Sequence, residues 1–290
     1  VWRCRSKMTP LQKIIKYGAI GFAIYLCLMI ISMTIFAITA IFGITTGMEI
    51  FNQNSQNTAM LTKWEQEYEN ITSLDIDLEI CKLTIKKGEK LKVEASNVTQ
   101  DFECKVEQNE LKIKEPPKSR WFFNQLNEAV AEVIIYVPEA LELKEVEIKT
   151  GVNETNIEHL KADKVDIEMG LGRYQIQELL ADDAKIEAGA GESKIEDSRI
   201  ENLKLETGLG SLKLTSKILK NADIDCGMGS VEINLLGKPE DYQVKAETGL
   251  GSFKVNGKQV SDNQVIGEGN SIIKVEAGVG ETVVNLQEEL

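Results

Sequence analysis

The sequence reads VDIEMGLGRYQI at residues 165–176, AKIEAGAGESKI at 184–195, LKLETGLGSLKL at 203–214 and ADIDCGMGSVEI at 222–233. Each segment has glycines between two short runs in which apolar and polar residues alternate. The glycine that opens this step recurs every 19 residues and then twice more at wider spacing, at Gly151, Gly170, Gly189, Gly208, Gly227, Gly249 and Gly278. A fixed period of about 20 residues is typical of a solenoid, in which each repeat forms one coil.

Alignment of the repeats on the first glycine predicts which columns face inward. In the repeat of Gly170, apolar residues stand five and three before the glycine, directly after it and six after it, and the other repeats are apolar at the same positions. A further inward column, eleven after the glycine, consists of Ala162, Ala181, Ile200 and Leu219. Inward residues stand at odd distances before the glycine but at an even distance later. The alternation of inward and outward residues must therefore shift by one residue at a bend near the G-x-G step.

Glycine tolerates the positive φ values that such a bend requires. We therefore predict an all-β, single-chain β-solenoid with coils of about 19 residues. The corner glycines are predicted to be Gly151, Gly170, Gly172, Gly189, Gly191, Gly208, Gly210, Gly227, Gly229, Gly249, Gly251, Gly278 and Gly280.

The segments before the repeats define the expected domain organisation. Residues 73–290 are assigned to the solenoid, because period-two alternation begins near residue 74. Within it, residues 116–131 break the pattern with an aromatic insertion, PPKSRWFFNQLNEAVA, which either caps one end of the solenoid or touches a membrane surface. Residues 49–72 are polar, and we expect a helical stalk there.

An apolar segment near the start predicts a membrane anchor. Residues 17–48 contain no charged side chain, and about 20 residues suffice to span a bilayer. Residues 1–16 are basic, which predicts a cytoplasmic N-terminus and a solenoid outside the cell. A cleaved signal peptide is the alternative, although its apolar core is shorter, about 7–15 residues. Met8 is an alternative start residue.

Charge and cysteine content exclude some classes of function. The formal net charge is −13, and five basic residues without any acid lie before the apolar segment, so the rest of the chain is more acidic still and nucleic acid is not an expected partner. Cys4 and Cys27 precede the solenoid, whereas Cys81, Cys104 and Cys226 lie within it. Their spacing indicates neither a zinc site nor a disulfide framework, although a bridge between Cys81 and Cys104 stays open. Cys226 is expected to be a small buried thiol.

Motifs that would indicate catalysis or a cofactor are not found. The G-x-G steps lack the third glycine, the helix and the distal acid of a dinucleotide site. They also lack the aspartates of a calcium-binding β-roll. The only histidine, His159, is expected to face outward in a turn, with no partners for a triad. No catalytic residue, cofactor or metal site is therefore predicted.

One outward column is acidic in nearly every repeat. Two residues before the glycine, a predicted acidic ladder begins with Lys149 and continues with Glu168, Glu187, Glu206, Asp225, Glu247 and Glu276. Neighbouring carboxylates about 4.8 Å apart repel by roughly 0.9 kcal/mol even in water. Lys185, Lys204, Lys245 and Lys274, two residues earlier, are placed to offset this repulsion. The ladder is either a solvated face of mixed charge or a stripe for a cationic partner or a weakly bound divalent cation.

These features resemble the "putative adhesin" family of bacterial membrane-anchored β-strand-repeat proteins, a domain of unknown function. The resemblance rests on SLDIDLEICKLTIKKGEKLKVEASN, VIIYVPEALELKEVEIKTG, the serial G-x-G steps and the final VEAGVGETVVNL. It implies a right-handed solenoid outside the cytoplasmic membrane. Since the family has no assigned activity, it implies no site residues.

The resulting functional hypothesis is a non-enzymatic, single-pass membrane protein of the cell envelope with a long interaction surface, used in adhesion, scaffolding or the envelope stress response. Its expected partner is an envelope protein or a glycan. One alternative is a carbohydrate-active enzyme that uses surface carboxylates. Another is a self-assembling scaffold, because the chain ends on a strand-like segment, VVNL, that could pair head to tail.

Overall fold

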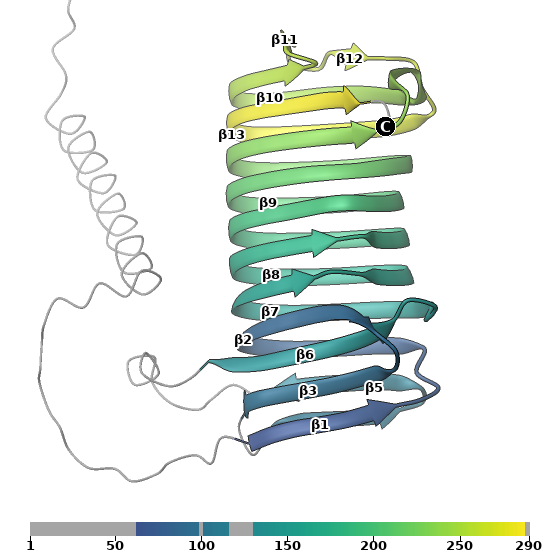
Figure 1. The fold of residues 1–290 in the computed structure, drawn as a ribbon. Coiled ribbons are helices and arrows are strands. Elements are labelled where there is room, and N and C mark those ends of the chain that lie inside the picture. The colour runs from purple at the N-terminus through teal and green to yellow at the C-terminus, as the bar shows by residue number, and fades with distance from the viewer. Residues whose placement is uncertain (1–61, 99–100, 116–129, 288–290) are drawn as a thin grey trace, which may run out of the picture. The chain divides into compact units, whose positions relative to one another are not determined.

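The computed structural model describes residues 62–98, 101–115 and 130–287 (Figure 1). They belong to a compact unit that extends over Thr58–Leu290. The predicted cytoplasmic segment 1–16, the predicted membrane helix 17–48 and nearly all of the aromatic insertion lie outside the described residues. Among the residues that are described, no helix is long and apolar enough to cross a membrane.

The described residues are almost entirely β-structured, which confirms the predicted all-β fold. A single sheet contains every strand, and the one helical element described is a short 3-10 helix, η2 (Pro239–Asp241). The strands are β1 (Thr62–Tyr68), β2 (Ser73–Gly88), β3 (Leu91–Val98), β4 (Glu103–Glu107), β5 (Glu110–Glu115), β6 (Ala131–Pro138), β7 (Leu143–Ile157), β8 (Leu160–Gln177), β9 (Leu179–Leu236), β10 (Tyr242–Val255), β11 (Lys258–Gln259), β12 (Val265–Ile266) and β13 (Ser271–Gln287).

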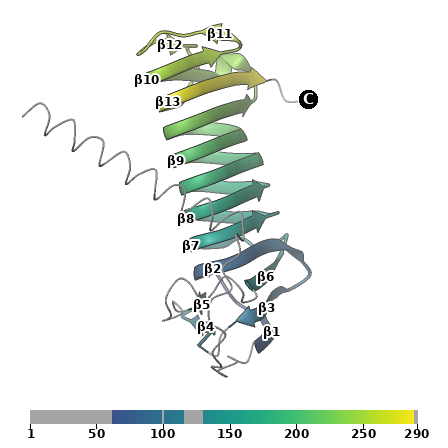
Figure 2. The same ribbon diagram turned by 90° about the vertical axis from the view of Figure 1, so that its left-hand side faces the viewer.

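The sheet coils on itself because equivalent positions of consecutive repeats pair in parallel (Figures 1 and 2). Strand β7 pairs with β8 so that Ile148 lies opposite Ile167, and β8 pairs with β9 so that Ile167 lies opposite Ile186. The register shift equals the 19-residue period, so each repeat completes one coil. Strand β9 contains three of the repeats without interruption.

The core is a stack of aliphatic side chains inside the coils. The columns five and three residues before the first glycine and six after it are no more than 4% exposed in every repeat, as illustrated by Val165, Ile167 and Ile176. This confirms the prediction for these three columns. In the column eleven after the glycine, Ala162, Ala181 and Ile200 are buried, but Leu219 is only half-buried.

The column directly after the first glycine does not face the core, and the prediction was wrong there. Leu171 is 40% exposed, Leu209 is 49% exposed and Leu250 is 76% exposed. The strand phase slips between the residue before the glycine and the residue after it, so the latter already follows the later parity and points outward. The apolar residue beside each glycine is therefore a surface residue.

The coils do not stack in sequence order at the C-terminal end. After β9 the chain passes through η2 into β10, and β13 then returns to lie between β9 and β10 in parallel with both. The segment after β10 covers parts of its outer edge through β11 and β12. The head-to-tail scaffold was predicted from a final strand with a free edge; in the structure both edges of β13 are paired, so that premise was wrong.

The N-terminal end of the unit is closed by antiparallel pairing. Strand β2 forms the first coil against β7, and its other edge pairs in parallel with β5 and β6, which in turn pair antiparallel with β4 and β3. Strand β3 links β6 to β1, so residues 62–68 belong to the sheet and are not part of a helical stalk. Their alternation, TKWEQEY, has charged residues on one side, which suits an edge strand. The alternation explains why this polar segment forms a strand.

Candidate functional site

A groove with a volume of about 1070 Å³ crosses the stacked coils from β2 to the end of the sheet. Each repeat contributes the residue two before the first glycine, the residue before it and the glycine itself. Asp262 and Asn263, from the segment that covers β10, line its far end, where the Asp262 carboxylate accepts a hydrogen bond from the Thr248 backbone N–H at 2.8 Å. Apart from this end and from β2, the groove is therefore built from the same three positions of each repeat.

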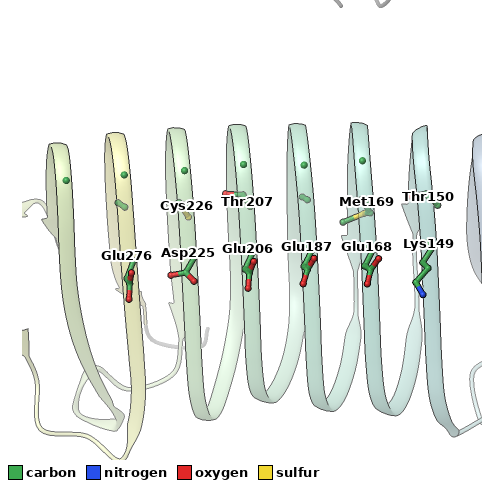
Figure 3. A pocket seen from close by; sticks show the side chains of 18 of the residues that line it. Lys149, Thr150, Glu168, Met169, Glu187, Glu206, Thr207, Asp225, Cys226 and Glu276 are labelled. Carbon is green, nitrogen blue, oxygen red and sulfur yellow. The ribbon is translucent and has the colours of Figure 1, made fainter. Parts of the chain in front are cut away.

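The predicted acidic ladder forms one side of this groove (Figure 3). Glu168 pairs in register with Lys149 on one side and with Glu187 on the other. Beyond β9 the order changes, because Glu276 of β13 lies opposite Asp225 and Glu247 is one coil further out. Sequence analysis missed one member, Asp77 of β2, which lies opposite Lys149. It was missed because β2 has no glycine step on which to align it.

Lysines two residues earlier pair with most of the ladder carboxylates. Lys185 lies 2.6 Å from Glu187, Lys204 lies 2.6 Å from Glu206, and Lys245 lies 2.5 Å from Glu247. The Lys274 ammonium likewise pairs with the Glu276 carboxylate. The lysine hydrogen bonds lower the pKa of Glu206 and of Glu247, because they stabilise the ionised carboxylates. These pairs are exposed to solvent, which screens them, so each contributes little to stability.

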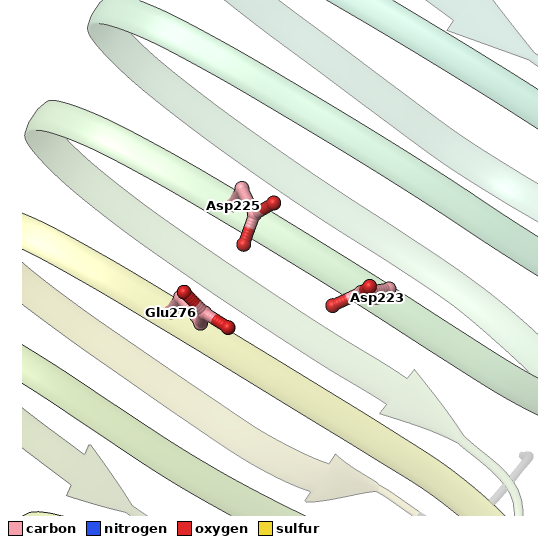
Figure 4. Close-up of side chains that lie close together, drawn as sticks. All are labelled: Asp223, Asp225 and Glu276. Carbon is pink, nitrogen blue, oxygen red and sulfur yellow. The ribbon is translucent and has the colours of Figure 1, made fainter.

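Asp225 differs from its neighbours in the ladder (Figure 4). Its Oδ1 atom is buried and has no hydrogen-bond partner among the described residues. Burial raises the pKa of this carboxyl, and the nearby charges of Glu276, Asp223 and Glu206 raise it further. Oxygen atoms of Asp223, Asp225 and Glu276 all lie within 4.8 Å of one another. The structure thus distinguishes one carboxylate in a column that had looked uniform in the sequence.

The floor of the groove consists of small or flexible side chains. These residues stand directly before the first glycine and are Thr150, Met169, Ala188, Thr207, Cys226, Ala277 and Thr248. Cys226 is 8% exposed, and burial raises the pKa of its thiol, as expected for a buried, protonated cysteine. Cys81 and Cys104 are free thiols, so the open question of a bridge between them is answered: none forms.

The glycines bring the coils into backbone contact along the groove. Gly210, the second glycine of its step, has a φ of +133°. A Cβ atom added to it would lie 1.9 Å from the carbonyl oxygen of Gly191 in the preceding coil. An L-side chain is therefore excluded both by the backbone conformation and by the neighbouring coil. The first glycines, which line the groove, are in similar contact: a Cβ atom added to Gly208 would lie 2.3 Å from the carbonyl oxygen of Gly189.

An exposed apolar ridge runs beside the glycines, and sequence analysis placed its residues after the first glycine in the core. We define the apolar ridge as the residues directly after the first glycine and their equivalent in β2: Ile80, Val152, Leu171, Ala190, Leu209, Met228, Val279 and Leu250. Apart from the half-buried Ala190, these side chains are 40–76% exposed. Stacked coils place them in one continuous row, parallel to the acidic ladder.

His159 is buried, contrary to the prediction that it faces outward. Its side chain is 3% exposed, and its Nδ1 atom lies 3.2 Å from the Glu178 carboxylate. The same carboxylate lies 2.9 Å from the Lys87 ammonium. His159 therefore packs beside the Glu178 carboxylate, away from the residues that line the groove.

Comparisons with known proteins support the fold. The family model Toastrack DUF4097 matches residues 71–277. A crystal structure described as a "putative adhesin" from Bacteroides fragilis is 14% identical, with a TM-score of 0.51, covering 78% of this chain and 96% of the other. A "putative cell adhesion protein" from Clostridium sporogenes is 19% identical, with a TM-score of 0.35, covering 78% of this chain and all of the other. At these identities the likeness to the Bacteroides structure shows the fold alone. No curated protein matches the chain.

Proposed function

The chain belongs to the Toastrack DUF4097 family, and we propose that it is a non-enzymatic protein of the cell envelope whose β-solenoid is an interaction surface. The observation that carries this proposal is the groove of about 1070 Å³ that repeats the same three positions in every coil. A surface built from repeated positions suits an elongated partner, whereas an enzyme needs one distinguished constellation. The expected partner is an envelope protein or a glycan.

The same proposal includes a single-pass membrane anchor at residues 17–48. Its support comes from the sequence, because this segment is uncharged and follows basic residues. In this arrangement the N-terminus is cytoplasmic and the solenoid is outside. Protease treatment of intact cells whose wall has been removed tests the topology. Digestion of the solenoid with protection of an N-terminal tag supports it, and protection of both ends contradicts it.

A carbohydrate-active enzyme remains the second candidate, and Asp225 is the observation that favours it. A carboxyl with a raised pKa in a groove is a feature of general acids. Glu206 and Glu247 have lowered pKa values instead, because each accepts a hydrogen bond from a lysine, and the Glu276 carboxylate pairs with Lys274. We therefore assign the groove to binding.

A single assay separates the two candidates. Purified residues 58–290, which form the compact unit, are mixed with isolated envelopes and with cell-wall glycan. The binding function predicts saturable retention on the envelopes and no release of reducing sugar. Release of reducing sugar by the wild type that is lost in Asp225→Asn would instead establish catalysis.

A further inference from the structure

The apolar ridge exposes large apolar side chains to solvent in the folded protein. Leu209, Met228, Val279 and Leu250 are 46–76% exposed, although they lie in the centre and at the outer end of the sheet. Large contiguous apolar patches on a soluble domain mark interaction sites more often than scattered apolar residues do. The ridge is thus a candidate contact surface, and its neighbours indicate what it contacts.

The acidic ladder lies three residues away from the ridge in each coil, across the glycines of the groove. Its carboxylates are not saturated by their lysines: the side chains of Glu187, Glu206 and Glu276 remain 39–43% exposed within their ion pairs. A carboxylate has about four acceptor positions, so each can accept further donors. Asp225 and Glu168 have no ion pair among the described residues. The acidic ladder of the groove and the apolar ridge therefore run across the coils as two parallel rows, with the glycines between them.

On this charge complementarity, we propose that the groove and the apolar ridge beside it bind an extended, basic polypeptide segment that runs along the solenoid axis, with Lys or Arg side chains on the acidic ladder and apolar side chains on the apolar ridge. The proposal rests on the binding function proposed above and names the partner's chemistry. An anionic lipid surface is disfavoured, because the acidic ladder would repel it.

The spacing of the coils favours one backbone conformation for this segment. Coils repeat every about 4.8 Å, so two coils span about 9.6 Å. A polyproline II helix has three residues per turn and advances about 9.3 Å per turn, so its side-chain stripes stay in step with every second coil. An α-helix advances about 5.4 Å per turn and drifts by about 0.6 Å at each coil. A ligand with one basic and one apolar stripe in polyproline II form thus matches both the acidic ladder and the apolar ridge.

The direct test measures binding of a labelled peptide, (Lys-Pro-Leu)4, to residues 58–290 by fluorescence anisotropy at low salt. In polyproline II form this peptide is about 37 Å long, close to the about 34 Å spanned by eight coils. We expect binding that weakens at least tenfold when Lys is replaced by Gln, and that weakens with added salt. A peptide of the same composition in scrambled order should bind several-fold more weakly, because its stripes are broken.

Protein variants locate the site. The triple variant Glu206→Gln, Asp225→Asn and Glu276→Gln should weaken binding about tenfold. The matched control, Glu65→Gln, Glu67→Gln and Glu103→Gln, removes the same charge from edge strands β1 and β4 and should stay within twofold of the wild type. Equal loss in both triples would show unspecific attraction and overturn the proposal.

The apolar ridge is tested in the same way. Leu209→Ser combined with Met228→Ser should weaken binding at least fivefold, whereas Val106→Ser, an apolar residue of β4 that is 48% exposed, should have no effect. Unchanged binding in the ridge variant overturns the proposal, as does tighter binding to anionic vesicles than to the peptide. If variants that cannot bind the peptide are still retained on envelopes, this ligand is rejected and the proposed function is kept. If the wild type is not retained on envelopes, the proposed function itself is rejected.

Discussion

Gly278 lies directly against Gly227, because a Cβ atom added to Gly278 would lie 2.4 Å from the Gly227 carbonyl oxygen. Gly249 precedes Gly278 in the chain, yet it lies one coil further out, against Gly278 itself. Strand β13 therefore fills a gap between two strands that precede it in the chain. Until β13 enters this gap, β9 and β10 each present an unpaired edge.

Removal of β13 should expose both of these edges. A chain that ends at residue 270 is expected to lose cooperative unfolding and to aggregate, because unpaired edges recruit other strands. Size-exclusion chromatography and circular dichroism measure both effects. A chain that ends at Gln287 retains all of β13 and is the control. A monomeric, cooperatively unfolding 270-residue chain would show that β13 is dispensable.

The second glycine of each step should not tolerate a side chain. Gly210→Ala is expected to destabilise the protein by about 3 kcal/mol or more, since it combines backbone strain with a clash against Gly191. Gly257 provides the comparison, because its φ is +73° but nothing lies within 4 Å of an added Cβ. Gly257→Ala should cost only about 1–2 kcal/mol. Equal losses in urea unfolding would mean that the contact between coils is unimportant.

Two ladder carboxyls should affect stability with opposite signs. The raised pKa of Asp225 means that the folded protein prefers its protonated form, so ionisation costs stability as the pH rises above about 4. Asp225→Asn should therefore be more stable than the wild type at pH 7, and the difference should shrink below pH 4.

Glu206 is the matched case, because its pKa is lowered by the hydrogen bond from Lys204. Its contribution is present above its usual pKa and is lost as the pH falls through the lowered pKa. Glu206→Gln should thus be less stable than the wild type at pH 7, with the gap closing in acid. Unfolding curves between pH 3 and pH 7 test both variants, and two differences of the same sign would contradict this assignment.

Two buried tyrosines should respond differently to loss of the hydroxyl. The Tyr174 hydroxyl is buried without a hydrogen-bond partner among the described residues, and burial raises its pKa to about 12. The Tyr242 hydroxyl donates to the Leu236 carbonyl oxygen at 2.6 Å. Tyr174→Phe should be neutral or stabilising by up to about 1 kcal/mol, whereas Tyr242→Phe should cost about 1–2 kcal/mol. Thermal unfolding of the two variants provides the comparison.

The repeat period and the main core columns could be predicted because they depend on local alternation. Val165, Ile167 and Ile176 are buried as predicted, because each lies in a part of the strand where inward and outward residues alternate regularly. The position of the phase slip was harder to predict. Leu171 is apolar, so the sequence alone fits a core position as well as a surface position. The buried Tyr174, Leu212 and Phe253, four residues after the glycine, could have indicated that the even parity begins early.

Long-range order was not predictable from the repeats. The steps at Gly249 and Gly278 are equivalent in sequence, and only the pairing of β13 with both β9 and β10 decides which lies inside. The distinct environment of Asp225 follows from the same pairing, because Glu276 is brought beside it from a distant part of the chain. For His159, a charged neighbourhood in sequence concealed a buried position beside Glu178.

The insertion of β13 between β9 and β10 also limits where this protein can change its length during evolution. Duplication of one 19-residue unit within β9 adds one coil of about 4.8 Å and leaves the closing segments at both ends intact. Duplication after Leu236 would disturb the gap that β13 must fill. Length variation should therefore arise within the region that encodes β9, and the stacked surface should lengthen in steps of one coil.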